Sequence, residues 1–389
     1  MNAPVITLTE FSSDPDKPLL ILGPSLGTST TALWATAAAL LTDRFHVVGW
    51  DLPGHGDSAP ASEPFTIADL GAGVIAAVDH LVNRSAGESF GYAGVSVGGA
   101  VGLSLLLEAP ERIGAAVVLC TGARIGETDG WRDRAAGVRA SGTASMVDGS
   151  IQRWFAPGFL ERRPHDAEGV LDALRAADDE SYAATCEALA AFDVRDRLAE
   201  IGSPVLAVAG DCDVVTPTPG LAQIADGVGN GGVVVLDNVA HLGCLEAPNM
   251  TAHLISTHLA SAASARSVLY DRGLRVRREV LGEAHVDRAT AAATDLTRDF
   301  QQFITQYAWG GIWTRPGLDR RSRSMITLTA LIARGHHDEF AMHVRAARTN
   351  GLTTAEISEV ILQSAIYCGV PDANTAFKIA QRVLDEEQA

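Results

Sequence analysis

The stretch from Phe90 to Leu103 constrains the fold of this chain more than any other. An apolar run, Phe90 to Ala93, leads into the pentapeptide Gly94-Val95-Ser96-Val97-Gly98, and small residues follow as far as Leu103. The order of strand, sharp turn and helix raises a serine hydroxyl above the edge of a sheet, and the glycines permit strand and helix to approach closely. The pentapeptide alone is equally compatible with a tight turn without chemistry, so its partners must be sought elsewhere.

Short apolar runs alternate with helical patterning through the first 260 residues. Continuous apolar runs are typical of parallel strands covered on both faces, and their alternation with helices predicts a doubly wound α/β sheet. Between about residues 126 and 199 the patterning is only helical, which predicts a helical lid inserted between two core strands. The predicted strands are Leu19–Leu22, His46–Trp50, Gly91–Ala93, Ala115–Leu119, Pro204–Val208 and Val233–Leu236.

Two acidic residues and a histidine follow the last two predicted strands. Asp211 and Asp213 come after one strand, and His241 comes after the next. Because the carboxyl ends of parallel strands meet at one edge of a sheet, Ser96, Asp213 and His241 are predicted to act as nucleophile, orienting acid and base. Asp211 is the rival acid, and Asp213 is preferred because it lies deeper in the loop.

The same arrangement requires two backbone N–H groups that stabilise an oxyanion. One is predicted at Val97, directly after the serine, and the other at Leu26, in the loop after the first strong strand. The loop from Asp51 to Ser58 also contains a histidine and acidic residues. It precedes the serine in the chain and is predicted to be structural.

The sequence changes character after about residue 265. The segment Ser261–Ala265 consists of small residues, and residues 261–267 are predicted to be a linker between one domain at 1–260 and a second at 268–389. Amphipathic helices are predicted at 290–307, 323–334 and 338–349, and a threonine of the pair Thr353-Thr354 is predicted to cap a further helix after the stop at Gly351. The second domain is therefore predicted to be small and all-α, and homo-oligomerisation through it is expected.

Charge and cysteine content exclude several classes of partner. The formal net charge of −17 argues against nucleic acid and against an anionic membrane. Five scattered cysteines without a C-x-x-C pair fit reduced thiols, and neither a signal peptide nor a membrane span is evident, so a cytoplasmic protein is predicted. His336-His337 lacks a third ligand at suitable spacing, so no metal is expected, and no organic cofactor either.

The first 260 residues resemble the 3-oxoadipate enol-lactonases, which have the α/β-hydrolase fold. The resemblance implies a small anionic lactone as substrate, with the lid arginines Arg132, Arg134 and Arg153 as candidates for binding its carboxylate. It implies that Trp131 and Trp154 line the pocket or the lid. The residues that carry it are Ser25–Thr28 with Trp34, Asp51–Gly56, Gly94–Gly99, Arg153–Phe155 and Ala240–Leu242.

The region after residue 268 resembles 4-carboxymuconolactone decarboxylase, from a helical family that also contains AhpD-type alkylhydroperoxidases. Peroxidase chemistry needs a Cys-x-x-Cys pair, and Cys368 stands alone. The spacing of Glu339 and His343 by itself favours a surface pair, but the resemblance favours His343 as proton donor with Glu339 setting its charge. His285 and Arg323 are weaker candidates. The resemblance rests on Arg277–Val286, Phe300–Gln301, Tyr307–Gly310, Trp313–Leu318, Arg323–Ser324, Glu339, His343 and Tyr367–Pro371.

Together the two resemblances imply a bifunctional enzyme of the protocatechuate branch of the 3-oxoadipate pathway. The second domain would decarboxylate 4-carboxymuconolactone, and the first would hydrolyse the enol-lactone that results. The alternative is another serine esterase or lactonase fused to a helical oligomerisation domain without catalytic function.

Overall fold

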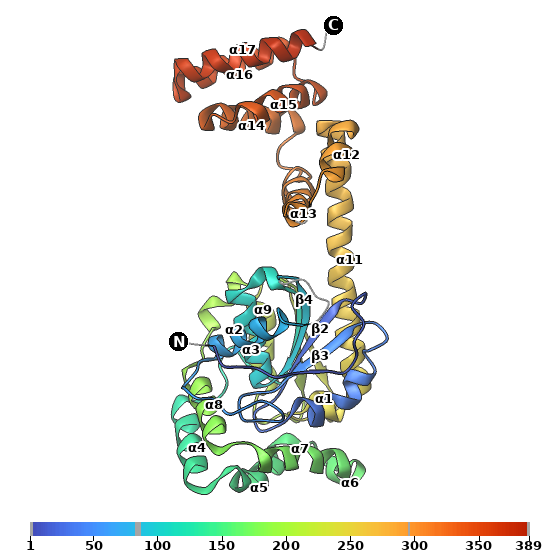
Figure 1. The fold of residues 1–389 in the computed structure, drawn as a ribbon, viewed down its shortest axis with the longest axis vertical. Coiled ribbons are helices and arrows are strands. Elements are labelled where there is room, and N and C mark those ends of the chain that lie inside the picture. The colour runs from blue at the N-terminus through green and yellow to red at the C-terminus, as the bar shows by residue number, and fades with distance from the viewer. Residues whose placement is uncertain (1–2, 82–86, 295, 387–389) are drawn as a thin grey trace. The chain divides into compact units, whose positions relative to one another are not determined.

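The computed structural model describes residues 3–81, 87–294 and 296–386. The chain divides into two compact units, Met1–Ala263 and Ser264–Ala389 (Figure 1). The first unit is an α/β fold and the second is helical, as the sequence predicts. In the described part of the chain, none of the helices is long and apolar enough to cross a bilayer.

A mostly parallel sheet forms the centre of the first unit. In its described residues the strand order is β1-β3-β2-β4-β5-β6-β7, and only the pairing of β1 with β3 is antiparallel. All six predicted strands are confirmed, and the sequence missed β1, which is too short for a recognisable pattern. The strands are β1 (Leu8–Glu10), β2 (Leu19–Gly23), β3 (His46–Trp50), β4 (Phe90–Val95), β5 (Ile113–Leu119), β6 (Val205–Gly210) and β7 (Gly231–Leu236).

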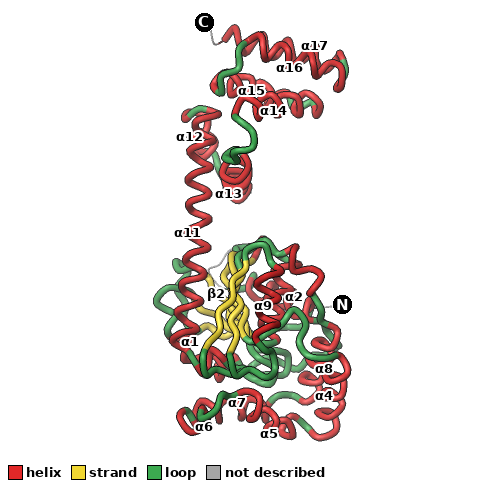
Figure 2. Tube along the Cα trace, turned by 180° about the vertical axis from the view of Figure 1, so that it is seen from behind, coloured by secondary structure: helices red, strands yellow, loops and turns green. Residues whose placement is uncertain are grey.

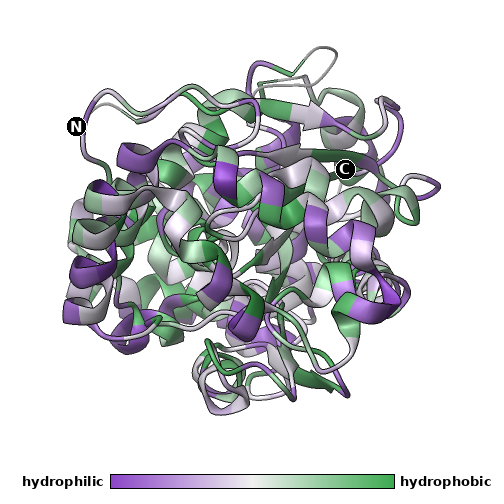
Figure 3. Cartoon of the chain, turned by 90° about the horizontal axis from the view of Figure 1, so that it is seen from below, coloured by the Kyte–Doolittle hydropathy of each residue, from purple (hydrophilic) through white to green (hydrophobic). Residues whose placement is uncertain are grey.

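Helices cover both faces of this sheet. Figure 2 shows α1 (Thr30–Ala39) and the first turns of α11 (Pro248–Leu281) on one face. The other face is covered by α2 (Ile67–Val78), α3 (Val97–Glu108) and α9 (Thr218–Gly227). Hydrophilic and hydrophobic residues alternate along the outer helices (Figure 3), whereas β2 and β3 are buried throughout, which places the core at the sheet.

The direction of winding reverses beside β2. Strand β3 lies on one side of β2 and β4 on the other, so the connections after β2 and after β4 leave the sheet in opposite directions. Such a switch point opens a crevice at the carboxyl ends of the strands, where open α/β sheets bind their ligands. The loop after β2 and the turn after β4 therefore frame the expected site.

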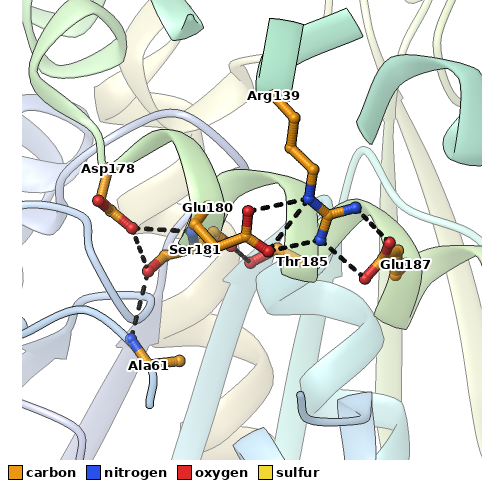
Figure 4. Close-up of polar contacts among 7 residues, drawn as sticks. All are labelled: Ala61, Arg139, Asp178, Glu180, Ser181, Thr185 and Glu187. Atoms are coloured by element: carbon orange, nitrogen blue, oxygen red, sulfur yellow. Dashed lines mark hydrogen bonds and ion pairs between the residues drawn. The ribbon is translucent and has the colours of Figure 1, made fainter. Parts of the chain in front are cut away.

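Between β5 and β6 the segment consists of helices joined by short loops and contains no strand, as predicted for residues 126–199. Arg139 of α4 forms ion pairs with Glu180 and Glu187 of α8 (Figure 4), which join the two helices of this insertion. The insertion contains α4 (Thr128–Ser141), η2 (Thr143–Met146), α5 (Val147–Trp154), α6 (Phe159–Arg162), α7 (Pro164–Ala176), α8 (Asp179–Ala191) and η3 (Arg195–Glu200).

The start of α8 is also attached to the body of the first unit. Asp178 accepts hydrogen bonds from the backbone N–H and hydroxyl of Ser181, and the Ser181 hydroxyl accepts one from the N–H of Ala61 (Figure 4). The N–H of Asp178 donates to the carbonyl of Gly54 at 2.8 Å. These contacts fix the helix that carries Tyr182, which becomes relevant at the candidate site.

The second unit is all-α. Thr353 caps α16 through a reciprocal capping box with Glu356, which confirms the predicted helix start. The helices that follow α11 are α12 (Glu283–Ala291), α13 (Arg298–Ile304), the π-helix η4 (Thr305–Ile312), α14 (Arg320–Arg334), α15 (His337–Thr349), α16 (Thr354–Cys368) and α17 (Val370–Glu386).

Two local predictions differ from the structure. The single helix predicted at 290–307 is wrong, because the Thr297 hydroxyl accepts a hydrogen bond from the backbone N–H of Thr294, and such a local bond competes with the helix. Residues 261–267, predicted as a linker, have helical backbone within α11. Alanine has the highest helix propensity, and this segment is rich in it.

Candidate active sites

Ser96 sits on a strained turn between β4 and α3. Its φ of 55° and ψ of −115° are unusual for a residue with a side chain. A Cβ at Gly94 would lie 2.4 Å from the carbonyl oxygen of Gly98, and one at Gly98 would lie 2.6 Å from the carbonyl oxygen of Pro24. Both glycines of the pentapeptide are therefore required by close backbone contacts, and the serine is held at the switch point.

The loop after β2 is bonded directly to this turn. The N–H of Gly98 donates to the carbonyl of Pro24 at 2.9 Å, and the Thr28 hydroxyl closes the loop by donating to the carbonyl of Ser25 at 2.8 Å. Among the described residues, neither the N–H of Leu26 nor that of Val97 donates to a protein acceptor. Two buried donors without partners beside a serine can bind a developing oxyanion.

Asp213 and His241 are brought together by the loops after β6 and β7. The Oδ2 atom of Asp213 lies 2.9 Å from Nδ1 of His241, and both side chains are almost fully buried. Oδ2 also accepts from the Thr216 hydroxyl at 2.7 Å, and Oδ1 accepts from the N–H groups of Val215 and Thr216. Burial alone would raise the pKa of Asp213, but the charge of His241 and these hydrogen bonds outweigh it and lower the pKa to about 2.

The rival acid and the loop before the serine have other contacts. Asp211 is exposed and accepts a hydrogen bond from the N–H of Val239 at 3.2 Å, rather than one from His241. Asp51 accepts from the N–H groups of Thr30 and Asp57 and so organises its own loop.

Glu246 helps to hold the loop that carries His241, and sequence reasoning missed this role. Its Oε1 atom accepts from the N–H of Ala240 at 2.9 Å, next to His241, and its Oε2 atom accepts from the N–H of Ala156 at 2.7 Å. Burial raises the pKa of Glu246. One carboxylate thus ties the histidine loop to the helical insertion. The sequence gives a single sign of this role, which is that an acidic residue follows shortly after the histidine.

The structure separates the three lid arginines. Arg132 is exposed and pairs with Asp129 at 3.6 Å. Arg134 and Arg153 are partly buried, and among the described residues neither forms an ion pair with a carboxylate. Burial and the neighbouring Arg134 lower the pKa of Arg153, so the two guanidinium groups are close enough to repel each other.

Both arginines gather around Tyr182, next to the loop after β2. The Tyr182 hydroxyl is buried and within electrostatic range of Arg134 and Arg153. A Cβ at Gly27 would lie 3.2 Å from the Tyr182 ring and 3.5 Å from Trp154. The cationic pair is therefore placed close to the loop that carries Leu26. Trp131 is buried in the insertion, where its ring lies 4.9 Å below the Arg134 guanidinium.

In the second unit, the imidazoles of His343 and His285 lie close enough for their charges to interact. Burial lowers the pKa of His343 to about 4, Glu339 opposes this, and His285 adds to it. Burial and the nearby Arg277 also lower the pKa of His285. Because burial outweighs the exposed carboxylate of Glu339, His343 is neutral at pH 7 in the free chain.

The remaining candidates in this unit have other roles. Arg323 donates to the carbonyls of Leu318 and Arg315 and so closes the loop before α14. His336 and His337 lie exposed at the start of α15. No group of three or more histidine, cysteine or acidic side chains that could hold a metal occurs among the residues that the structure describes.

Comparisons with known proteins match both units. Residues 20–254 match the Alpha/beta hydrolase family and residues 298–382 the Carboxymuconolactone decarboxylase family. The chain is 36% identical to 3-oxoadipate enol-lactonase 2 of Acinetobacter baylyi over 240 residues, which cover 62% of this chain and 88% of that protein. It is 46% identical to 4-carboxymuconolactone decarboxylase of the same species over 117 residues, 30% of this chain and 87% of that protein.

A solved structure shows the same likeness for the first unit. The enol-lactonase from Burkholderia xenovorans LB400 superposes with a TM-score of 0.62 at 27% identity, over 66% of this chain and 96% of that chain. The chain therefore belongs to the alpha/beta hydrolase family through its first unit and to the carboxymuconolactone decarboxylase family through its second.

Proposed function

We propose that this chain is a bifunctional enzyme of aromatic catabolism. The second unit decarboxylates 4-carboxymuconolactone, and the first unit hydrolyses the resulting enol-lactone to 3-oxoadipate. The observation that carries the proposal is the contact of Asp213 with His241 at the same edge of the sheet as Ser96 and the unpartnered N–H groups. The similarity to an enol-lactonase and to a decarboxylase of one pathway supports the pairing of the two reactions.

In the proposed hydrolysis, Ser96 Oγ attacks the lactone carbonyl carbon while His241 accepts the hydroxyl proton. The N–H groups of Leu26 and Val97 stabilise the oxyanion, and Asp213 orients the imidazole. The ring C–O bond then breaks, and the leaving enolate takes the proton that His241 holds and becomes the ketone of the product. Water hydrolyses the acyl-enzyme with His241 again as base.

Arg134 and Arg153 are the proposed partners of the lactone's free carboxylate. Of the three candidate lid arginines, these two have no carboxylate partner among the described residues, and they lie near the loop that carries Leu26. A carboxylate placed between two guanidinium groups relieves their mutual repulsion and forms charge-assisted hydrogen bonds. The ion pair with Asp129 removes Arg132 from this role.

In the proposed decarboxylation, the bond from the ring carbon to the departing carboxylate breaks. Its electron pair forms a dienolate that extends into the lactone carbonyl, and protonation beside that carbonyl gives the enol-lactone. We propose His343 as proton donor, with Glu339 favouring its charged form and His285 as the alternative donor. The substrate carboxylates bring further negative charge, which favours the imidazolium that the free chain disfavours.

We further propose that the protein is cytoplasmic and self-associates through the second unit. All five cysteines are free thiols. In the second unit several large apolar side chains are more than half exposed, and Phe303 stacks on Tyr307 at 5.5 Å. Such a surface is typical of contacts between copies of one chain. The exposed residues include Phe300, Phe303, Tyr307, Ile366, Tyr367 and Val370.

The variant Ser96→Ala tests the proposal. It removes only the nucleophile of the first unit, so 4-carboxymuconolactone is expected to be consumed at the normal rate while the enol-lactone accumulates. Product analysis against time for the wild type and the variant measures both steps. Lactone opening at the wild-type rate would show that Ser96 is not the nucleophile, and a wild type that leaves 4-carboxymuconolactone unchanged would refute the decarboxylase assignment.

A further inference from the structure

Arg277 in α11 is a buried cation of the second unit, and none of the described residues offers it an anionic partner. Only 5% of the residue is exposed. Its Nη1 donates to the Thr305 hydroxyl at 3.1 Å and its Nη2 to the side-chain carbonyl of Gln301 at 3.0 Å, both neutral acceptors. Its Nε is buried and has no partner among the described residues. A guanidinium carries five N–H donors, so this one is incompletely satisfied.

Other arginines of this unit differ from Arg277 both in having an acidic partner and in lying near the surface. Within the described part of this unit, four arginines form pairs with acidic side chains, and each lies near the surface, where an ion pair contributes little. Of the arginines in this unit whose burial is described, Arg277 is buried most deeply, and there an unpaired charge is costly in lost solvation. The four pairs are Arg278–Asp287, Arg320–Glu279, Arg321–Glu356 and Arg345–Glu386.

The local fold holds Arg277 in this position. A Cβ at Gly273 would lie 2.0 Å from the carbonyl oxygen of Thr305, and one at Gly310 would lie 2.4 Å from that of Leu269. The backbones of α11 and η4 thus pack in direct contact. Because Gly273 and Arg277 lie one helical turn apart on the same face of α11, the arginine side chain is directed at the start of η4.

The same packing connects Arg277 to the two histidines. A small apolar cluster joins Val276 and Val280 of α11 to Trp309 of η4 and Ala346 of α15, and His343 lies one turn before Ala346. His285 is within electrostatic range of both Arg277 and His343. Arg277, which has no anionic partner among the described residues, therefore lies in the same region of the second unit as the imidazoles of His285 and His343.

We propose that Arg277 binds a carboxylate of the decarboxylase substrate and positions it beside His285 and His343. Nε has no partner and Nη2 carries a second N–H besides the one that bonds Gln301, so this edge can donate the two side-on bonds that carboxylates accept from arginine. The inference rests on the proposed decarboxylase activity and names the residue that recognises its anionic substrate. Arg277 is thus a binding residue for the part of the substrate that remains after carbon dioxide leaves.

The test compares Arg277→Met with Arg277→Lys and with Arg275→Met, an exposed arginine of the same helix. Loss of a charge-assisted pair predicts a KM for 4-carboxymuconolactone raised roughly 10- to 100-fold in Arg277→Met, with a smaller change in kcat. Arg277→Lys keeps the charge but not the two-bond geometry, so a smaller rise is expected. Arg275→Met is expected to match the wild type. Lactone hydrolysis and melting temperature, measured on the same preparations, report folding.

An unchanged KM in folded Arg277→Met overturns the inference and leaves the proposed function standing. If Arg277→Met does not fold, Arg277→Lys decides, and wild-type KM there overturns the inference. If the wild type does not decarboxylate, the proposed function fails, and calorimetric titration with adipate then decides. If Arg277→Met binds one adipate molecule fewer than Arg275→Met does, the result supports an anion site at Arg277. If both variants bind the same number of adipate molecules, the result refutes it.

Discussion

The N–H of His241 donates a hydrogen bond to the carbonyl of Trp154 at 3.1 Å, which connects the proposed catalytic base directly to the helical insertion. Glu246 reinforces this connection, because its two carboxylate oxygens accept from Ala240 and from Ala156. The position of the imidazole therefore depends on the insertion as well as on the sheet.

The first prediction concerns Glu246→Gln. A glutamine can accept one of the two backbone hydrogen bonds but places an NH₂ group against the other donor. Loss of a charged acceptor costs roughly 1.5–3 kcal/mol per bond, so kcat for lactone hydrolysis is expected to fall at least tenfold. Steady-state lactone hydrolysis measures this, with Glu161→Gln, an exposed residue of α6, as the matched control. Equal kcat values in the two variants would exclude a positioning role.

The second prediction separates the two aspartates. Asp213→Asn is expected to lower kcat for lactone hydrolysis by about 10⁴-fold, since the imidazole loses its orienting carboxylate. Asp211→Asn is expected to change kcat less than threefold, because Asp211 is exposed and bonded to Val239. Hydrolysis rates of both variants measure the difference, and a larger loss in Asp211→Asn would assign the acid to Asp211.

The third prediction concerns the contact between the serine turn and the oxyanion loop. In Gly98→Ala the new methyl group would lie 2.6 Å from backbone atoms of Gly23 and Pro24, so the loop that carries Leu26 must move. The kcat for lactone hydrolysis is expected to fall roughly 10²- to 10³-fold, as when an oxyanion donor is lost.

The matched control for this variant is Gly137→Ala in α4, where a Cβ meets nothing within 4 Å. It is expected to keep full activity and to raise the unfolding free energy by roughly 0.5–1 kcal/mol. Chemical denaturation of both variants separates an effect on the site from an effect on folding.

The fourth prediction concerns proton delivery. His343→Ala is expected to reduce decarboxylation at least a hundredfold while lactone hydrolysis by the same preparation stays normal. Glu339→Gln removes the carboxylate that favours the imidazolium, so the pH dependence of decarboxylation is expected to shift to lower pH. Rate-against-pH profiles measure both effects, with His337→Ala as control. A normal rate in His343→Ala would transfer the role to His285.

The fifth prediction follows from the buried imidazole of His343. Its folded pKa of about 4 lies below the ordinary value of 6.5, so the unfolded chain binds the proton first as the pH falls. The stability of the second unit is therefore expected to be complete above about pH 6.5 and to decrease towards pH 4. Melting temperatures against pH measure this, and His343→Gln is expected to flatten the dependence in that range.

Local sequence sufficed for much of the first unit. Apolar runs report burial on both faces of a strand, and the glycines around Ser96 report a turn that tolerates no side chains, because both signals depend on neighbouring residues alone. Chain order and strand ends predicted that Asp213 and His241 lie near each other. The sequence favoured Asp213 over Asp211 by its place in the loop, but only the folding of that loop decides which carboxylate faces the histidine.

The features that depend on distant segments were decided by tertiary structure. The sequence contains Arg277 within a charged helix and offers no sign that it is buried without a carboxylate among the described residues, since that depends on the packing of η4 against Gly273. Glu246, likewise, is one acidic residue among many until two loops place N–H groups against it. The sequence by itself determined the elements and the order of the chemical groups, because these follow from local pattern. Only the three-dimensional packing decided which charges have partners, because a partner can come from anywhere in the chain.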